Sequence, residues 1–316
     1  MEALGSYGIG QNLCSPKKPK SLQKPTISAS LVSSGFIGFP IIIALCHFLP
    51  ALHLCFTTRV HLLHAIILGA IEGMTEFLPI SSTAHLILAS RLLGLSQTDF
   101  QTTFEIFIQL GSILAVVVFY GKSLLRDRAT FMRVAVAFVP TAIIGLVLQK
   151  IIMHIFFGSL AVVLWALFLG GIILILFERW HREKPSDARS LERITYKQAF
   201  LIGCFQALAV VPGVSRAAAT IVGGQLVGVE RKTIVDFSFL LAIPTMIAAT
   251  GLDLIKSPHN FSGSQLGLLA VGFLVSFAVA LLAIRWFLAY IKNHSFAPFG
   301  VYRIAVALIF SIGLLF

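Results

Sequence analysis

Apolar residues fill six long stretches in the C-terminal part of the chain, and polar residues gather in the segments between them. Each stretch is about 20 residues long, enough for an α-helix to cross roughly 30 Å of hydrocarbon. Because they are almost free of charged side chains, we expect them to be transmembrane helices. The stretches cover about residues 102–120, 131–149, 159–177, 234–255, 266–287 and 300–316.

Two further apolar segments are interrupted by Gly, Pro and hydroxyl-bearing residues. They are "ILGAIEGMTEFLPISSTAHL" (67–86) and "LIGCFQALAVVPGVSRAAAT" (201–220). A broken helix leaves backbone groups that lipid cannot satisfy, so such a segment must pack inside the protein or line a wet cavity. We therefore predict that both segments are re-entrant helical hairpins.

The two interrupted segments also resemble each other at a shift of about 134 positions. Gly69 aligns with Gly203, and Ser81 aligns with Ser215. Farther along, "FEIFIQLGSILA" (104–115) aligns with "FSFLLAIPTMIA" (237–248) at nearly the same shift. The pattern predicts a duplication, with one repeat over about 61–180 and the other over about 195–316.

Three crossings in each half, an odd number, would place the halves in opposite orientations. Loop charges agree, because Lys and Arg accumulate in short cytoplasmic loops. They gather in 121–133 and 178–198, whereas 150–158 and 256–265 hold one Lys each. The prediction is an all-α polytopic membrane protein with an inverted-topology repeat, each half consisting of one re-entrant helical hairpin and three transmembrane helices. The first hairpin would enter from outside and the second from the cytoplasm, with their tips meeting near the midplane.

Composition supports a membrane protein and argues against other classes. Of 316 residues, 57% are hydrophobic and 12% are charged, and the mean hydropathy is +0.93. The net charge of +11 does not indicate a nucleic-acid partner, because the Lys and Arg residues are scattered between apolar spans. The four cysteines show no metal-ligand spacing.

The N-terminal residues 1–60 form a separate predicted region. Residues 1–35 are polar and rich in Lys and Pro, which is typical of a disordered arm. The apolar run 36–56 lacks a clear cleavage site, so we interpret it as an uncleaved membrane anchor, although its prolines and histidines weaken it. The remainder, 61–316, is the predicted membrane domain.

Glu72 and Glu76 are four positions apart, so a helix places both on one face. In an apolar environment, two like charges need protonation, a basic partner or a cation. A divalent cation, Mg²⁺ or Ca²⁺, would satisfy both carboxylates and could also carry a phosphate. The alternative is a structural pair hydrogen-bonded to neighbouring backbone.

Hydroxyl groups and a histidine follow the carboxylates: Ser81, Ser82, Thr83 and His85. Together with the carboxylates they provide what is needed to activate a hydroxyl nucleophile and to protonate a leaving group. The alternatives are that the hydroxyls only cap a second helix and that His85 is only packed.

The second hairpin supplies the cationic Arg216 after a Pro-Gly turn. Arg binds phosphate in a bidentate manner, and a helix N-terminus favours anions. Arg216 could also serve only as a counter-ion for the glutamates. Together the two hairpins predict a membrane-buried site for a lipid-linked phosphate ester or diphosphate.

Several segments together resemble the undecaprenyl-diphosphate phosphatase family, the BacA-type bacitracin-resistance proteins. The match covers about 61–316 and rests on Glu72-x-x-x-Glu76 with "FLPISSTAHL", followed by "QLGSILAVVVFY", "YKQAFLIGCFQ", "PGVSRAAAT" and "FSFLLAIP". The resemblance implies hydrolysis of undecaprenyl diphosphate to undecaprenyl phosphate and inorganic phosphate in the bacterial cytoplasmic membrane. This reaction recycles the lipid carrier of peptidoglycan synthesis and confers bacitracin resistance.

The resemblance also implies roles for individual residues. Catalysis would involve Glu76, Ser82, His85 and Arg216, with Glu72 and Glu76 holding the metal and Ser82 as the nucleophile. Substrate binding would involve Ser81, Thr83, Ser215, Arg216 and Thr220. One position departs from the family pattern, because Ala217 stands where a serine usually follows the arginine.

Two mechanisms fit these residues: attack by Ser82, which we favour, or attack by an activated water. A different function, transport or scrambling of a phosphate-bearing lipid, fits the predicted repeat, but it does not need the Ser and His residues beside the carboxylates. The sequence leaves open whether the protein forms a homodimer and whether its site opens to both membrane faces.

Overall fold

The computed structural model describes residues 60–96, 98–151, 159–182, 184, 188–256 and 261–313. The predictions for residues 1–59, including the arm and the anchor, lie outside these ranges. Within them the structure is helical and contains no strand, only an isolated bridge between Ala188 and Val229. The helices are α2 (Leu62–Thr75), α3 (Ser82–Leu92), α4 (Asp99–Arg126), α5 (Arg128–Ile151), α6 (Leu160–Trp180), α7 (Tyr196–Ala207), α8 (Arg216–Leu226), α9 (Arg231–Lys256), α10 (Gly263–Tyr290) and α11 (Ala297–Gly313), with short 3₁₀ turns η3 (Leu191–Arg193) and η4 (Leu208–Val210).

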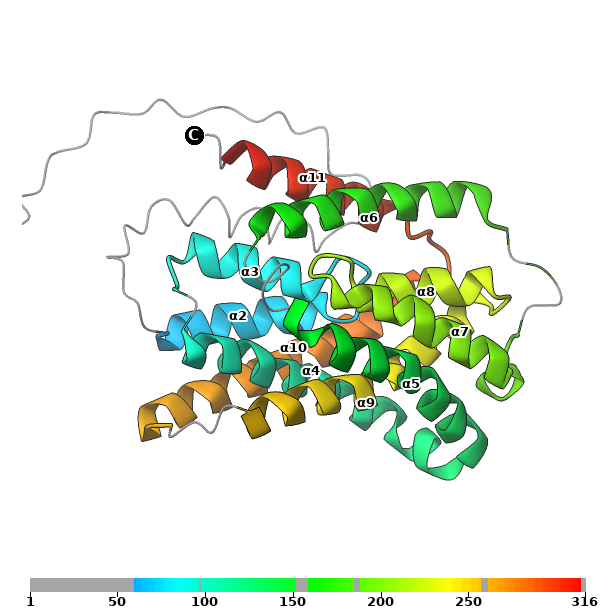
Figure 1. Ribbon diagram of the computed structural model, residues 1–316, viewed down its shortest axis with the longest axis horizontal. Coiled ribbons are helices and arrows are strands. Elements are labelled where there is room, and N and C mark those ends of the chain that lie inside the picture. Colours follow the sequence, from blue (N-terminus) through cyan, green and yellow to red (C-terminus); the bar gives the residue numbers. More distant parts are fainter. Residues whose placement is uncertain are drawn as a thin grey trace, which may run out of the picture. The chain divides into compact units, whose positions relative to one another are not determined.

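Five of these helices are long and apolar enough to cross a membrane: α4, α5, α6, α9 and α10. They coincide with five of the six predicted spans, and Figure 1 shows them in order along the chain. The sixth predicted span, 300–316, corresponds to α11, which has 17 described residues and ends at Gly313. The prediction of an all-α polytopic membrane protein is confirmed.

The two interrupted segments form helix–turn–helix hairpins, α2–α3 and α7–α8. α2 has 14 residues and α7 has 12, so each is about 18–21 Å long and shorter than the hydrocarbon layer. In each hairpin the second helix begins after a serine in a left-handed backbone conformation, with φ of 72° at Ser81 and 77° at Ser215. These two serines are the aligned pair of the sequence repeat, so both turns reverse the chain by the same local geometry.

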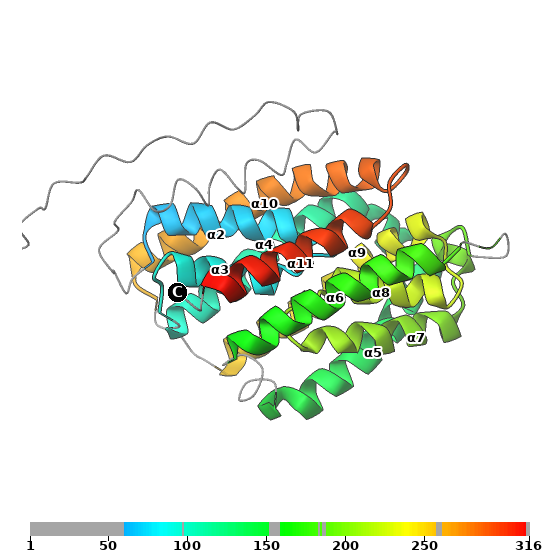
Figure 2. The same ribbon diagram turned by 90° about the horizontal axis from the view of Figure 1, so that it is seen from above.

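The first helix of each hairpin packs against a long helix of the other half, so that α2 lies beside α10 and α7 lies beside α5 (Figure 2). Glycine permits the contact in both places. A Cβ added at Gly69 would lie 2.6 Å from the carbonyl oxygen of Gly272, and one added at Gly203 would lie 2.0 Å from that of Ala137. Because only a hydrogen atom fits at these positions, the backbones can approach closely.

The contacts also show the direction of each hairpin. Gly69 and Gly73 of α2 face Gly272 and Ser276 of α10 in the same order, so these two helices run parallel. The contacts of Gly203 with Ala137 and of Gln206 with Thr141 likewise make α7 parallel to α5.

The Arg-rich connections meet at one end of the helix bundle. Arg133 at the start of α5 donates hydrogen bonds to the carbonyls of Glu192 (2.7 Å) and Ile194. Arg231 at the start of α9 pairs with Glu178 near the end of α6 at 3.1 Å and donates to the carbonyl of His294 after α10. We call this end the arginine-rich face. Because α10 ends there and α5 begins there, α2 runs toward this face and α7 runs away from it.

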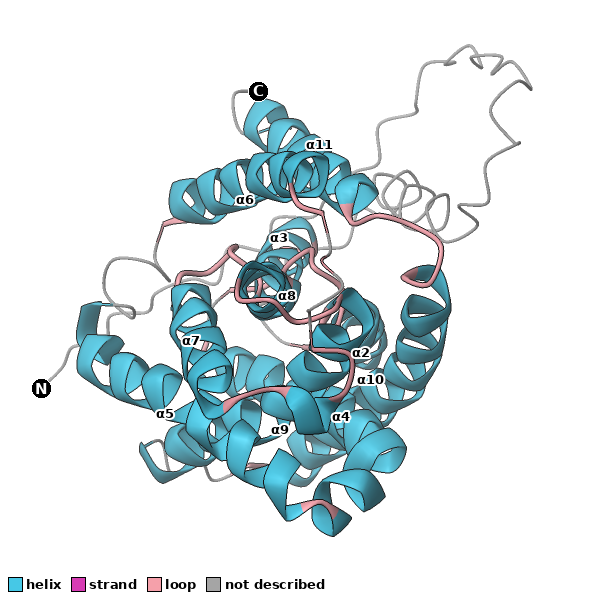
Figure 3. Cartoon of the chain, turned by 90° about the vertical axis from the view of Figure 1, so that its right-hand side faces the viewer, coloured by secondary structure: helices cyan, strands magenta, loops and turns pink. Residues whose placement is uncertain are grey.

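Helices α3 and α8 occupy the interior, where the other helices surround them (Figure 3). α6 and α11 pack against each other, and a buried apolar cluster joins them to α3 through Ala84, Leu88, Leu167 and Ala307. The fold thus places α3 and α8, each of which begins directly after a hairpin turn, among the longer helices.

Candidate active site

The turns of the two hairpins enclose a cavity of about 80 Å³, which we call the hairpin pocket. This volume exceeds the roughly 10 to 15 Å³ that one buried water needs. Met246 of α9 also lines this pocket. The predicted meeting of the hairpin tips is therefore present in the structure. The polar side chains that line the pocket are Glu76, Ser81, Ser82, Thr83, Ser215 and Arg216.

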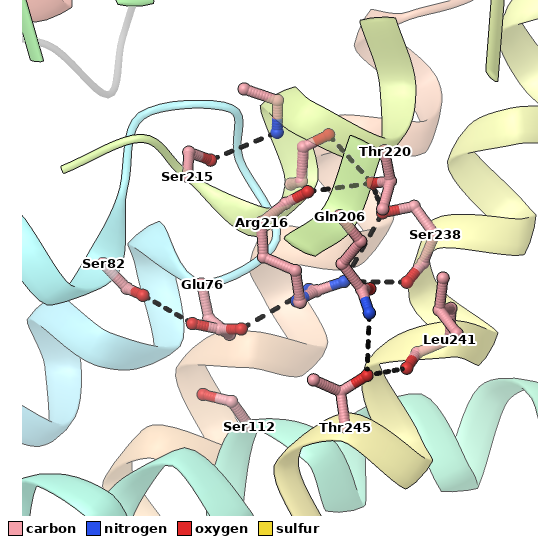
Figure 4. Close-up of polar contacts among 12 residues, drawn as sticks. Glu76, Ser82, Ser112, Gln206, Ser215, Arg216, Thr220, Ser238, Leu241 and Thr245 are labelled. Carbon is pink, nitrogen blue, oxygen red and sulfur yellow. Dashed lines mark hydrogen bonds and ion pairs between the residues drawn. The ribbon is translucent and has the colours of Figure 1, made fainter. Parts of the chain in front are cut away.

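The Glu76 carboxylate lies between a hydroxyl and a guanidinium (Figure 4). Ser82 Oγ donates a hydrogen bond of 2.5 Å to Glu76 Oε2. On the other side, Arg216 Nη2 lies 3.4 Å from Glu76 Oε1. Glu76 is 5% exposed and Arg216 is 9% exposed, so low solvent access strengthens the electrostatic attraction between them.

The turn explains how Glu76 reaches Ser82. Glu76 is the C-cap residue of α2, and Ser82 is the first residue of α3. Between them, Pro79 has no N–H to continue the helix, and the positive φ of Ser81 reverses the chain direction. Ser82 thereby lies at a helix N-terminus, where free backbone N–H groups and the helix dipole favour a phosphate.

Arg216 is held by a second set of contacts. Its Nη1 donates to the backbone carbonyl of Ser238 at 2.8 Å, and Ser238 Oγ lies 2.6 Å from Thr220 Oγ1. The buried Arg216 Nε atom has no hydrogen-bond partner among the described residues. Arg216 therefore keeps a donor that could bind an anion.

The predicted substrate ligands have different surroundings. Ser81, Thr83 and Ser215 line the pocket, although Ser215 Oγ also caps α8 by accepting from the N–H of Ala218 at 3.2 Å. Thr220 does not line the pocket, and its hydroxyl bonds to Ser238 and to the carbonyls of its own helix. Thr220 thus contacts Ser238, which accepts a hydrogen bond from Arg216, and does not face the pocket.

His85 does not line the hairpin pocket either. Its Nδ1 lies 2.8 Å from the carbonyl oxygen of Ser81, and its Nε2 lies 2.7 Å from the hydroxyl of Tyr302 on α11. A carbonyl oxygen only accepts, so Nδ1 carries the proton, and Nε2 of the neutral ring accepts from the tyrosine. His85 therefore holds the turn at Ser81, and the two hydrogen bonds of its ring go to Ser81 and Tyr302 rather than to Ser82.

Glu72 is fully buried one helical turn before Glu76, outside the pocket lining. Neither of its carboxylate oxygens has a hydrogen-bond partner among the described residues. Among all of the described residues, no group of three or more His, Cys, Asp or Glu side chains is arranged so that it could hold a metal. Mg²⁺ is nevertheless commonly bound by one or two carboxylates together with water and substrate phosphates, so the donor set of Glu72 and Glu76 fits a divalent cation.

Three residues around the site were not identified from the sequence: Ser238, Tyr302 and Arg303. Ser238 belongs to the repeated segment "FSFLLAIP", where a hydroxyl stands among apolar residues. Arg303 is a charge within a predicted membrane span, which by itself marks a functional candidate. These signals were available, but no local pattern connects the residues to the hairpins.

Comparison with known proteins agrees with the family resemblance that the sequence motifs indicate. The family model for the bacitracin resistance protein BacA matches residues 65–309. The undecaprenyl-diphosphatase of Sulfurihydrogenibium sp. (strain YO3AOP1) is 53% identical over 248 residues, covering 78% of this chain and 97% of that protein. The protein of the same name from Wolinella succinogenes is 51% identical over 247 residues (78% and 96%), and that from Aquifex aeolicus is 50% identical over 252 residues (80% and 98%).

Proposed function

The chain belongs to the bacitracin resistance protein BacA family, and we propose that it hydrolyses undecaprenyl diphosphate to undecaprenyl phosphate and inorganic phosphate in the hairpin pocket. The family predicted from the sequence motifs is confirmed. The observation that carries the proposal is the Ser82 hydroxyl, hydrogen-bonded to Glu76 and facing Arg216 across that carboxylate. The activity recycles the lipid carrier of peptidoglycan synthesis.

In the first step, Ser82 attacks the terminal phosphorus of the diphosphate. Its proton moves to Glu76 Oε2, the acceptor of the existing 2.5 Å hydrogen bond. A bond forms between Ser82 Oγ and phosphorus, and the bond from phosphorus to the bridging oxygen breaks. Undecaprenyl phosphate leaves and takes the proton from Glu76.

In the second step, water attacks the phosphoserine and gives its proton to Glu76. Inorganic phosphate leaves, and the proton returns to Ser82, so the site is restored. A direct attack by water remains the alternative mechanism. The distance from Ser82 to Glu76 favours the serine, because the base already contacts the nucleophile.

Arg216 stabilises the negative charge that develops on the phosphate oxygens, which is the main requirement of phosphoryl transfer. Its long 3.4 Å contact with Glu76 and its unpartnered Nε suit an exchange of partners when phosphate enters. Ser81, Thr83 and Ser215 supply further hydroxyls at the pocket wall. A divalent cation held by Glu72 and Glu76 would supply additional positive charge toward the diphosphate.

The proposal includes the inverted-topology repeat, with two re-entrant hairpins that enter from opposite faces of the bacterial cytoplasmic membrane. Several observations support it: α2 and α7 run in opposite directions, each is too short to cross, and each packs on a helix of the other half. The arginine-rich face would be cytoplasmic. A lipid substrate could then remain in the bilayer while its diphosphate reaches the pocket.

One chain supplies both hairpins, so the proposed site is complete without a second copy, and the homodimer remains a prediction. Lipid transport, the alternative function, uses inverted repeats as well. The comparisons favour the phosphatase, because the curated relatives at about 50% identity carry the name of that enzyme.

The test is phosphate release from undecaprenyl diphosphate by the purified protein in detergent, with and without a chelator. We expect release by the wild type, loss of release in Glu76→Gln and Arg216→Ala, and restoration by Mg²⁺ after chelation. Gly251→Ala, at a glycine where an added Cβ would meet nothing within 4 Å, serves as the folding control. Absence of phosphate release by the folded wild type would contradict the proposed function.

A further inference from the structure

Arg303 on α11 is a buried cation without an acidic partner among the described residues. Its exposed fraction is 0%, and the salt bridges in the described part of the chain involve Arg216 and Arg231 but not Arg303. A buried charge is costly unless hydrogen bonds compensate for its lost hydration. The environment of Arg303 must therefore supply acceptors of another kind.

Five backbone carbonyls supply them. Nη1 donates to Pro79 (3.2 Å) and Val214 (2.9 Å). Nη2 donates to Gly213 (2.8 Å) and Ala166 (3.0 Å), and Nε donates to Leu167 (3.3 Å). A guanidinium has five N–H groups in a fixed plane, so each of them has one carbonyl acceptor.

These carbonyls belong to three separate parts of the fold. Pro79 is in the turn of the first hairpin, whereas Gly213 and Val214 are in the turn of the second. The remaining two acceptors are on α6. Pro79 precedes Ser82 by three residues, and Val214 precedes Arg216 by two. One planar group thus connects the two turns that carry the nucleophile and the anion-binding arginine.

The chain leaves space for this group at Gly170 on α6. A Cβ added there would lie 2.0 Å from Arg303 Nη2 and 2.7 Å from Arg303 Cζ. The neighbouring Tyr302 binds His85, which in turn holds the Ser81 carbonyl. α11 therefore contacts the first turn directly through Arg303 and indirectly through Tyr302 and His85.

We propose that Arg303 is a positioning residue, which sets the separation between Ser82 and Arg216 by joining the two hairpin turns, without touching the substrate. The inference rests on the proposed function. A displacement of about 1 Å between reacting groups can reduce the rate on the order of 100-fold. Lysine cannot replace this arginine, because its ammonium has three donors and lacks the planar fork.

The experiment compares Arg303→Lys and Gly170→Ala with the wild type, using undecaprenyl diphosphate in detergent. Gly170→Ala leaves Arg303 in the sequence but pushes on its guanidinium, so it tests the same contact if Arg303→Lys folds poorly. The matched control is Gly267→Ala on α10, where an added Cβ meets nothing within 4 Å. The amount of monodisperse folded protein and the melting temperature are measured for each variant.

We expect kcat per folded molecule to fall about 10- to 100-fold in Arg303→Lys and Gly170→Ala, with KM changed by about twofold or less because the pocket side chains are retained. Gly267→Ala should keep the kcat of the wild type. A purely structural role would lower the yield of folded protein and leave kcat per folded molecule unchanged, and that result in both variants would overturn the proposal. Inactivity of the wild type would instead contradict the proposed function.

Discussion

Ser81 and Ser82 are adjacent and chemically identical, yet the turn gives them different surroundings. Ser82 Oγ contacts the Glu76 carboxylate. Ser81 has a positive φ, makes no capping hydrogen bond through its side chain, and is held through its carbonyl by His85. Only Ser82 is therefore placed next to a base.

For this reason Ser82→Ala should abolish phosphate release, whereas Ser81→Ala should only weaken it. An acid-quenched reaction with substrate labelled in the terminal phosphate should also yield labelled protein in the wild type and none in Ser82→Ala. Equal residual activity in the two alanine variants would remove Ser82 as the nucleophile.

Arg216 combines charge with a planar geometry, and a second variant separates the two properties. Arg216→Lys keeps the positive charge near Glu76 but loses bidentate donation to phosphate. We expect kcat/KM to fall on the order of 100-fold, as it does when a preorganised donor to the transition state is removed, with a small change in melting temperature. A lysine variant with wild-type kcat/KM would show that charge alone is sufficient.

Sequence reasoning identified the residues of the site that lie close together in the chain. The pair Glu76 and Ser82 and the lone Arg216 stand out because charges and hydroxyls are rare in apolar segments. The position of the His85 ring could not be predicted in the same way, because its contact with Tyr302 joins positions 217 residues apart. Proximity in the sequence suggested catalysis for His85, but the reversed turn directs its ring toward α11.

At the scale of helices, apolar patterns located the spans but underestimated their length. The predicted span 102–120 is the central part of α4, which runs from Asp99 to Arg126. A hydrophobic stretch marks only the membrane-embedded length of a helix, whereas the backbone hydrogen bonds of the helix continue into the polar residues at either end. The close approach of α7 to α5 could not be predicted, because it depends on Gly203 meeting a particular carbonyl in three dimensions.

The close packing of α7 on α5 predicts that one added methyl group at Gly203 destabilises the protein. In Gly203→Ala, the new Cβ would collide with the Ala137 carbonyl at 2.0 Å, so we expect a loss of about 1–3 kcal/mol in stability. Gly145→Ala on the partner helix α5 has open space and should not lower stability. Thermal unfolding in detergent distinguishes the two, and an equal melting temperature in both variants would contradict the close helix contact.

For the molecule as a whole, the charge pattern of the loops predicts which ends of the helices share a side of the membrane. The contacts of Arg133 and Arg231 agree with that pattern, because they join the Arg-rich connections at one face. The sequence could predict this face because Lys and Arg are counted without knowing any contact. It could not predict which helices pack together across the two halves.

Membrane-impermeant thiol labelling tests this arrangement in a variant without native cysteines. Arg128→Cys and Arg189→Cys should react only when the cytoplasmic side is accessible, as in inverted vesicles. Ser262→Cys, before α10, should react in intact spheroplasts. Labelling of Arg128→Cys and Ser262→Cys from the same side would rule out the proposed topology.

Helices of one half pack against helices of the other, α2 against α10 and α7 against α5, and this has a consequence for biosynthesis. When the ribosome has completed the first half of the chain, α10, the helix against which Gly69 packs, has not yet been made. That helix is translated roughly 200 residues later, so this contact must close a very long loop. The first hairpin therefore lacks this packing partner until most of the chain has been translated, and the proposed site can form only once almost the entire polypeptide has been made.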